Sequence, residues 1–237
     1  MRDLRIRCSL LGKIMTNPTA AAAKAGEVLS VGAKTAIRQL AAEDIFGVDF
    51  EFTSKETEKG NLVEPLSIAL YNRVVGTSLA KNTERRTDGF VTGEPDLVIP
   101  GVRGVDIKSS WSLKTFPIAE VDAEDPDYEW QARGYMRLWD LPEWEVAYCM
   151  VSTPDNLIGF EMQSMHLVDH IPEAMRLTRW AIKRDAEKEA LIEHKVKAAR
   201  AYYAQVLAEF DRVHGGMPDT SLERLLTESI ARVREPA

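Results

Sequence analysis

The stretch GEPDLVIPGVRGVDIKSS, residues 93–110, alternates apolar and polar side chains on both sides of the segment PGVRG. Proline and glycine at these positions favour a tight turn, so the two halves are predicted to pair as a β-hairpin. Successive side chains of a strand point to opposite faces, which places Asp106 and Lys108 on one face and Ile107 in the core. The turn also brings Asp96 opposite Asp106 across the ladder.

The two opposed aspartates are the feature of this hairpin that suggests chemistry. Directly opposed like charges destabilise a sheet, and a cation between them removes the conflict. Mg²⁺ prefers a few carboxylates, several waters and a substrate phosphate. Lys108 beside such a site could orient or deprotonate an attacking water and balance charge in the transition state. The alternative is a surface hairpin in which Asp106 and Lys108 form a weak exposed pair of ~0–1 kcal/mol, since the D-x-K pattern alone is common.

The whole chain has the composition of an ordinary globular protein. Its 237 residues are 45% hydrophobic and 28% charged, and no apolar run reaches the ~20 residues of a membrane span. No signal peptide is expected at the N-terminus, so the predicted location is the cytoplasm. Cys8 and Cys149 are too few for a disulfide framework or a cysteine-ligated cluster, and any metal is expected on oxygen ligands. The net charge of −7 argues against a protein that coats nucleic acid through global electrostatics.

Periodicity predicts an α/β fold, a central mixed β-sheet flanked by helices with a long helical C-terminal region. Residues 1–237 are expected to form a single domain, with a core over about 7–153 and the helical region over about 166–237. Pro65 is expected in a first helical turn, because proline is tolerated there. Helices are predicted at 33–47, 55–76, 127–141 and, with one possible break, about 171–213; extended or strand segments are predicted at 48–53, 78–83, 89–92, 96–99, 102–108 and 144–153.

Four motifs in order resemble those of the PD-(D/E)XK nucleases, whose core is restriction-endonuclease-like. They are Glu64 on a helix, the pair Pro95-Asp96, the run Asp106-Ile107-Lys108, and the Q-x-x-x-Y pattern that begins at Gln131. Within that superfamily the chain is most similar to phage-type exonucleases related to lambda exonuclease and to YqaJ-like viral recombinases. The last motif resembles the RecB-like branch. The resemblance covers roughly residues 7–153, and the C-terminal third adds little to it.

The resemblance implies a role for each of these residues. Asp96 and Asp106 correspond to direct metal ligands, with the Ile107 carbonyl as a third, and Lys108 corresponds to the catalytic lysine. Glu64 corresponds to the helix carboxylate that reaches a metal directly or through water; a surface or capping glutamate is its alternative.

Further residues are implied around this centre. Gln131 corresponds to the glutamine that supports the lysine and the nucleophilic water. Tyr135 is expected either to contact DNA or to serve as a core aromatic residue.

Candidate contacts to phosphate lie on both sides of these motifs. Ser9 and Arg7 resemble a segment that binds a 5′-phosphate, although Ser9 also fits a plain helix cap. Ser109 and Ser110 follow the lysine and could donate hydrogen bonds to a phosphate. Lambda-type enzymes have a serine where this chain has Glu94, so the polarity of end recognition stays open.

The function implied is a Mg²⁺-dependent exonuclease, with Mn²⁺ as a substitute, that resects linear double-stranded DNA ends in a bacterial host cell. The resemblance to this family also implies a single-strand annealing protein as partner and a homo-oligomeric ring around DNA. An endonuclease, or a nuclease for single-stranded or branched DNA, is the alternative within the same chemistry. A DNA-binding assembly protein on a decayed nuclease fold is the non-enzymatic alternative, although Asp96, Asp106 and Lys108 are all present.

Overall fold

The computed structural model describes residues 4–50 and 54–216, and these residues form two sheets flanked by helices. The larger sheet has the strand order β4-β5-β6-β7, with β5 and β6 parallel and the outer pairs antiparallel. The smaller sheet has the order β1-β3-β2. The strands are β1 (Ile6–Arg7), β2 (Arg86–Thr87), β3 (Val91–Gly93), β4 (Leu97–Ile99), β5 (Arg103–Ser109), β6 (Glu143–Cys149) and β7 (Leu177–Lys183). The mixed sheet between helices agrees with the predicted α/β class.

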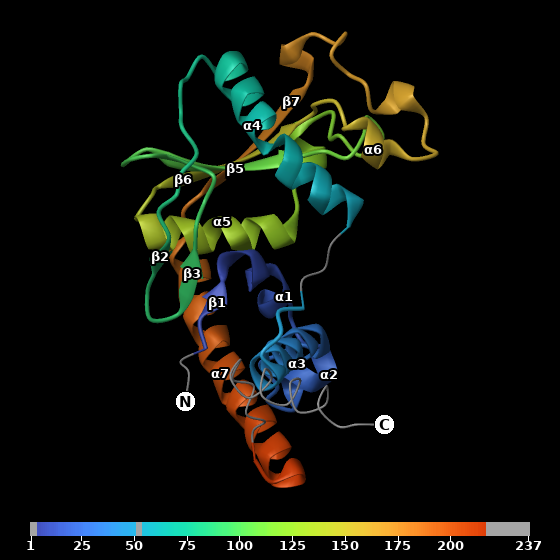
Figure 1. Ribbon diagram of the computed structural model, residues 1–237. Coiled ribbons are helices and arrows are strands. Elements are labelled where there is room, and N and C mark those ends of the chain that lie inside the picture. The colour runs from blue at the N-terminus through green and yellow to red at the C-terminus, as the bar shows by residue number, and fades with distance from the viewer. Residues whose placement is uncertain (1–3, 51–53, 217–237) are drawn as a thin grey trace, which may run out of the picture.

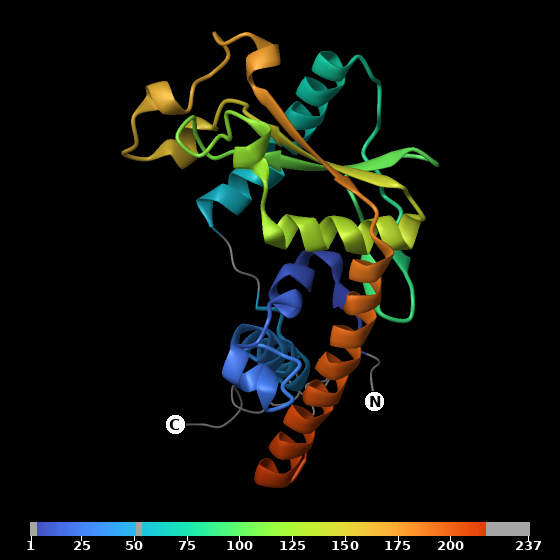
Figure 2. The ribbon, with the colours of Figure 1, turned by 180° about the vertical axis from the view of Figure 1, so that it is seen from behind.

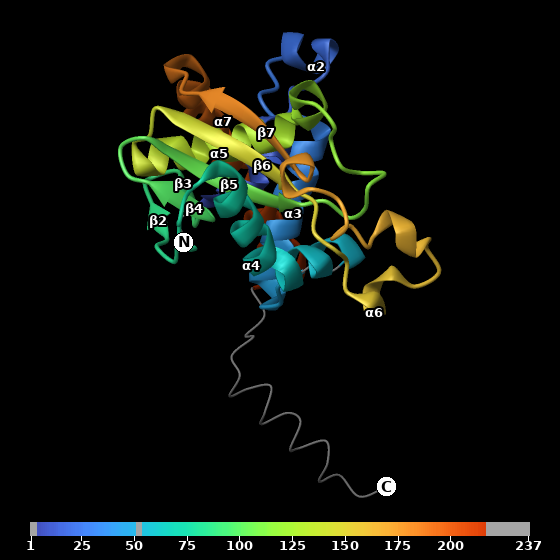
Figure 3. The same ribbon diagram turned by 90° about the horizontal axis from the view of Figure 1, so that it is seen from above.

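Helices cover both faces of the larger sheet, with α4 on one side and α5 on the other (Figure 1). Seen from above, β5, β6 and β7 lie side by side beneath α4 (Figure 3). The α-helices are α1 (Leu11–Met15), α2 (Ala20–Lys24), α3 (Val31–Phe46), α4 (Lys55–Val75), α5 (Pro126–Trp139), α6 (Asp155–Ile158) and α7 (Ala186–His214). The 3₁₀ turns are η1 (Cys8–Leu10), η2 (Glu120–Ala123), η3 (Gln163–Met165) and η4 (Glu173–Met175).

Strand β5 sends alternate side chains to the two faces, as the pattern predicts. Val105 and Ile107 are buried in the apolar cluster under α4, whereas Asp106 and Lys108 reach Gln131 of α5 through direct contacts. The second and larger apolar cluster lies on the α5 side and continues into α1, α3 and α7. In Figure 2, α7 runs away from the sheets with the N-terminal helices alongside it.

Local sequence sets the ends of the two helices that flank the sheet. Ser54 caps α4, because its hydroxyl accepts from the backbone N–H of Thr57, and Gly76 ends the helix at a φ of 75°. Asp125 caps α5 and is followed by Pro126 at the first helical position, where proline is favoured. Among the helices in the described part of the chain, none combines the length and apolar character of a membrane span.

Three predictions of secondary structure were wrong. Pro65 lies inside α4 rather than in its first turn. The helix bends along its length (Figure 1), and Pro65 and Asn61, whose carbonyl loses its helical partner, are both exposed, so water can satisfy that carbonyl. Residues 78–83, predicted as a strand, form neither helix nor strand. Residues 48–50, predicted as a strand or an extended segment, form no strand, and the rest of that segment, 51–53, lies outside the described residues.

The third correction concerns the C-terminal region. Residues 177–183 form β7, which pairs antiparallel with β6 over seven residues, where a helix was predicted. The helical spacing of the residues after 186 led to the prediction of a helix here. The alternating side chains of 177–183 instead suit a strand, which pairs with the edge of β6 that β5 leaves free. Helix α7 is continuous from Ala186 to His214, so the possible break within a helix is not found, and Arg184 and Asp185 instead link β7 to α7.

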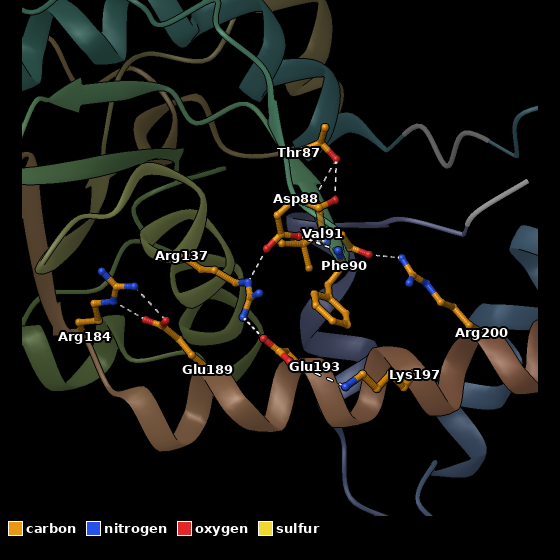
Figure 4. Close-up of polar contacts among 11 residues, drawn as sticks. Thr87, Asp88, Phe90, Val91, Arg137, Arg184, Glu189, Glu193, Lys197 and Arg200 are labelled. Carbon is orange, nitrogen blue, oxygen red and sulfur yellow. Dashed lines mark hydrogen bonds and ion pairs between the residues drawn. The ribbon is translucent and has the colours of Figure 1, made fainter.

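The hairpin between β2 and β3 is locked to α5 and α7 by charged side chains (Figure 4). The guanidinium of Arg137 contacts Asp88 in the turn and lies 2.9 Å from a carboxylate oxygen of Glu193 on α7. The Phe90 ring is approached by the Arg137 and Arg200 cations at 5.2 and 5.6 Å from its centroid. Because β3 leads within three residues to Asp96, these contacts fix the strand that delivers that side chain.

Candidate active site

A cleft of ≈ 510 Å³ lies where β5 ends, lined by residues of α4, the hairpin and α5. It gathers residues that are up to 92 positions apart in the sequence, from Glu56 to Tyr148. Most of the residues singled out from the sequence line it, namely Glu64, Asp96, Asp106, Ile107, Lys108, Ser109, Ser110, Gln131 and Tyr135. The cleft therefore collects the four motifs in one place.

The two aspartates lie together as the hairpin register requires. Leu97 pairs with Val105, so Asp96 precedes the ladder opposite Asp106, and its carboxylate accepts from the Ile107 backbone N–H at 2.6 Å. Asp106 is 5% exposed, and its Oδ2 atom is buried without a hydrogen-bond partner. Burial first, and the Asp106 charge second, raise the pKa of Asp96 to about 7. The pair is thus a buried concentration of negative charge.

Lys108 lies against this pair on the same face of β5. Its Nζ is 2.7 Å from Asp106 Oδ2, an ion pair without hydrogen-bond alignment, and it donates to Gln131 Oε1 at 3.4 Å. Nζ is also 4.1 Å from the centroid of the Tyr128 ring. Burial alone lowers the pKa of Lys108, but Asp106 and Tyr128 outweigh it and the net shift is upward. Lys108 is therefore an ammonium group at neutral pH.

Gln131 connects the lysine to the aspartate from the first half of α5. Its Nε2 donates to Asp106 Oδ1 at 3.3 Å and to the Tyr135 hydroxyl at 3.4 Å, while its Oε1 accepts from Lys108. Tyr135, one turn later, is 5% exposed and stacks on Trp144 with ring centroids 5.0 Å apart. The ring of Tyr135 thus belongs to the core, and its hydroxyl donates to the Glu94 carbonyl at 3.4 Å.

Glu64 enters the cleft from α4 and contacts Lys81 of the irregular segment 77–85. Its negative charge also contributes to the raised pKa of Asp96, after burial and Asp106. Within residues 4–50 and 54–216, no three His, Cys, Asp or Glu side chains gather closely enough to hold a metal ion by themselves. A cation here would therefore need oxygen atoms of backbone, water or substrate to complete its shell.

The serines after Lys108 differ in their surroundings. The Ser109 hydroxyl lies 2.8 Å from that of Ser67 on α4, whereas Ser110 Oγ is buried without a partner. Both line the cleft. Ser110 is the one with free hydrogen-bonding capacity toward an incoming oxygen.

Arg7 and Ser9 do not line this cleft. Both are exposed, and Ser9 is the middle residue of η1 rather than its cap, while Arg7 occupies the cap position without a side-chain hydrogen bond. Glu94 forms an ion pair with Arg85 at 3.3 Å, so a basic residue offsets the acid that stands where lambda-type enzymes have serine.

Sequence reasoning missed two residues that build the cleft. Tyr128 lies under Lys108 and shares the α5 face of Gln131, three positions earlier, a spacing that could have identified it. Lys59 is fully buried and donates to the carbonyls of Ser110, Trp111 and Val151 at 2.6, 3.0 and 2.9 Å. A lysine within the buried stripe of α4 was the available signal for it.

Comparisons with known proteins agree with this geometry. The crystal structure of a phage-related exonuclease from Haemophilus somnus 129PT matches with a TM-score of 0.81 and 36% identity, over 87% of this chain and 96% of that one. An alkaline exonuclease from Laribacter hongkongensis, LHK-Exo, shares the fold at 17% identity and a TM-score of 0.61, over 88% of this chain and 91% of that one. A complex of LHK-Exo with dAMP matches equally.

No family model matches the chain, and no curated protein does. The level of identity and the coverage of the Haemophilus somnus structure nevertheless show the family. The chain belongs to the phage-related exonucleases of the PD-(D/E)XK class and is a DNA-hydrolysing enzyme.

Proposed function

We propose that the protein is a Mg²⁺-dependent exonuclease that resects the ends of linear double-stranded DNA, with Mn²⁺ able to replace Mg²⁺. The observation that carries this proposal is the convergence of Asp96, Asp106 and Lys108 in a single cleft. Family membership supplies the reaction class, and the cleft supplies a place for it.

The residues present fit a divalent cation. Asp106 Oδ2 is buried without a hydrogen-bond partner, and Asp96 has a pKa raised to about 7 by burial and by Asp106. Both features mark a site in which two buried carboxylates face a single ammonium group, that of Lys108, so negative charge is in excess. Asp96 and Asp106 would hold the cation with the Ile107 carbonyl, and Glu64 would reach it directly or through water. When bound, Mg²⁺ would polarise the scissile phosphate and lower the pKa of a coordinated water.

The chain's own residues have separable tasks around that site. Lys108 lies beside Asp106 and Gln131, where its ammonium group can donate hydrogen bonds to the attacking water or to a phosphate oxygen. Gln131 holds Lys108 and Asp106 in register through its two amide atoms. Ser110 offers an unpaired hydroxyl at the cleft wall for a phosphate oxygen.

The biological setting is a further part of the proposal. The resemblance to phage-type exonucleases supports a role in recombination, in which the enzyme exposes single strands for an annealing protein. It also supports a homo-oligomeric ring around DNA, which is compatible with a chain of net charge −7 if basic residues are confined to the channel.

A single digestion experiment tests the proposal. Linear duplex DNA with a 5′-phosphate on one end only is incubated with the protein in Mg²⁺ and in EDTA, beside a closed circular duplex. Lys108→Ala is the test variant, and Lys24→Ala, an exposed lysine of α2 outside the cleft, is the control. Mononucleotide release from the linear duplex alone, dependent on Mg²⁺ and on Lys108, is expected and gives the polarity.

Other outcomes have definite meanings. Cutting of the closed circular duplex would refute the exonuclease proposal and support the endonuclease alternative. Absence of hydrolysis by folded protein in Mg²⁺ refutes duplex resection, and single-stranded and branched DNA then distinguish a nuclease of another specificity from a DNA-binding assembly protein.

A further inference from the structure

The irregular segment 77–85 between α4 and β2 is fixed at two points beside the cleft. The Asn72 side chain on α4 donates to the Leu79 carbonyl at 2.9 Å and accepts from the Leu79 N–H at 3.0 Å. Three residues later, the Asn82 N–H donates to the Asp96 carbonyl at 2.7 Å. The segment therefore joins α4 to the hairpin and has a defined position at the cleft rim despite its lack of helix or strand.

Lys81 is presented between these two fixed points. Its ammonium group contacts Glu64 Oε2, and 47% of its side chain is exposed to solvent. The hydrogen bond with Glu64 is the main cause of a raised pKa for Lys81, and the charges of Asp96 and Glu94 add to it. Lys81 is thus a cation at the edge of the acidic cleft, with one side free to meet a ligand.

The cleft is rich in carboxylates, whose negative charge a nearby cation offsets. Four carboxylates surround the hairpin, those of Glu64, Glu94, Asp96 and Asp106, and DNA brings further negative charge. Glu94 is offset by Arg85 and Asp106 by Lys108, so Lys81 is the partner of Glu64. A half-exposed ion pair is weakly held, and a lysine stem is flexible, so a change of partner costs little.

We propose that Lys81 exchanges partners during the reaction cycle: it holds Glu64 in the metal-free protein and binds a backbone phosphate of DNA once a divalent cation occupies the cleft. The inference rests on the proposed metal site at Asp96 and Asp106. In the DNA-bound state Lys81 then contacts a phosphate of the substrate strand. This role explains why a basic residue lies at the cleft rim beside the Glu64 carboxylate.

Lys81→Met tests the exchange because it keeps most of the side-chain length and removes the charge. Without a competing ammonium, Glu64 is free, and Mg²⁺ is expected to bind about 2–5-fold more tightly by titration calorimetry with Mg²⁺ alone. Binding of duplex DNA in Mg²⁺, measured in a Lys108→Ala background, is expected to weaken, with the slope of log affinity against log salt reduced by about 1. In EDTA, where Lys81 is held by Glu64, the substitution is expected to change DNA affinity less.

Arg73→Met is the matched control. Arg73 forms an exposed ion pair with Glu173 at 2.7 Å near the other end of α4, so its loss changes net charge equally without touching the cleft. Lys81→Arg retains the cation and is expected to keep most of the DNA affinity.

The outcomes separate two failures. If wild-type protein binds Mg²⁺ and Lys81→Met behaves like Arg73→Met in both assays, the exchange is refuted. Weaker Mg²⁺ binding in Lys81→Met also overturns it, because Lys81 then only orients Glu64. If wild-type protein shows no saturable Mg²⁺ binding, or Asp106→Asn leaves that binding unchanged, the metal site of the proposed function is refuted, and the exchange falls with it.

Discussion

The buried pair of aspartates makes the stability of the metal-free protein depend on pH in an unusual direction. Asp96 has a pKa of about 7 in the folded protein, against an ordinary value of 3.8, because of burial and the neighbouring Asp106. Between pH 4 and 7 the folded state therefore holds a proton that the unfolded chain releases. The resulting stabilisation is complete below about pH 4 and is lost as the pH rises through about 7.

The magnitude follows from the size of the shift. About three pKa units at about 1.4 kcal/mol each set an upper limit of about 4 kcal/mol. About two of these pKa units lie above pH 5, and Asp96 retains some solvent contact, so we expect the unfolding free energy to fall by about 2 kcal/mol between pH 5 and pH 7.5. Carboxylates with lowered pKa values, such as Asp88 and Glu129, lose their contribution only at lower pH and do not enter this window.

Urea unfolding in EDTA across this range measures the effect. Asp96→Asn is the comparison, because the amide oxygen still accepts from the Ile107 N–H while the ionisable group is gone. The wild-type protein should lose stability with rising pH, Asp96→Asn should lose little, and Mg²⁺ should restore stability to the wild type mainly near neutral pH. A wild-type stability that stays level or rises over this range, or an equal slope in Asp96→Asn, would contradict the buried-pair argument.

Three further predictions concern the catalytic lysine, a buried lysine and a buried glycine. Lys108→Met should lower the rate of hydrolysis by about 10²–10⁴-fold, checked by single-turnover kinetics on end-labelled duplex, and an equal rate would exclude a catalytic role for Lys108. Lys59→Met should reduce the unfolding free energy by about 3–5 kcal/mol in denaturant titrations, since three buried carbonyls lose the hydrogen bonds that they accept from Lys59, although that of Trp111 keeps one from Thr153. Gly104→Ala should reduce the unfolding free energy by about 3 kcal/mol or more, because the new Cβ would lie 2.0 Å from the Trp144 ring. Gly32→Ala in α3 is the control: no atom lies nearer than 3.8 Å to its Cβ, so it should be neutral or stabilising by ~1 kcal/mol. Equal thermal midpoints of the two variants would refute the crowding at Gly104.

The hairpin and its charged face were predictable because their determinants are local. Alternation, a turn of proline and glycine, and the facing of alternate residues on a strand fix the register that brings Asp96 to Asp106. Gln131 followed from a motif rather than from local physics, since its place beside Asp106 depends on how α5 packs across the sheet.

Features that depend on distant partners were beyond local pattern. Lys59 stands out only by its place in the stripe of α4, and Lys81 not at all, because the partners of these two lysines lie 17–92 positions away in the sequence. The strand β7 was missed for the same reason, since its alternation gains meaning only beside the free edge of β6. The roles expected of Arg7 and Ser9 rest on resemblance alone, and both residues stand outside the cleft.

The unequal packing on the two faces of the larger sheet has a consequence for how the cleft opens. Helix α5 belongs to the extended apolar cluster that continues into α1, α3 and α7, whereas α4 is held by a smaller, separate cluster and by the Lys59 hydrogen bonds. Regions with fewer buried contacts unfold locally at lower free energy. Amide hydrogens of α4 should therefore exchange with solvent before those of α5. Local opening would then displace α4 and its Glu64 while Gln131 and the hairpin keep their positions.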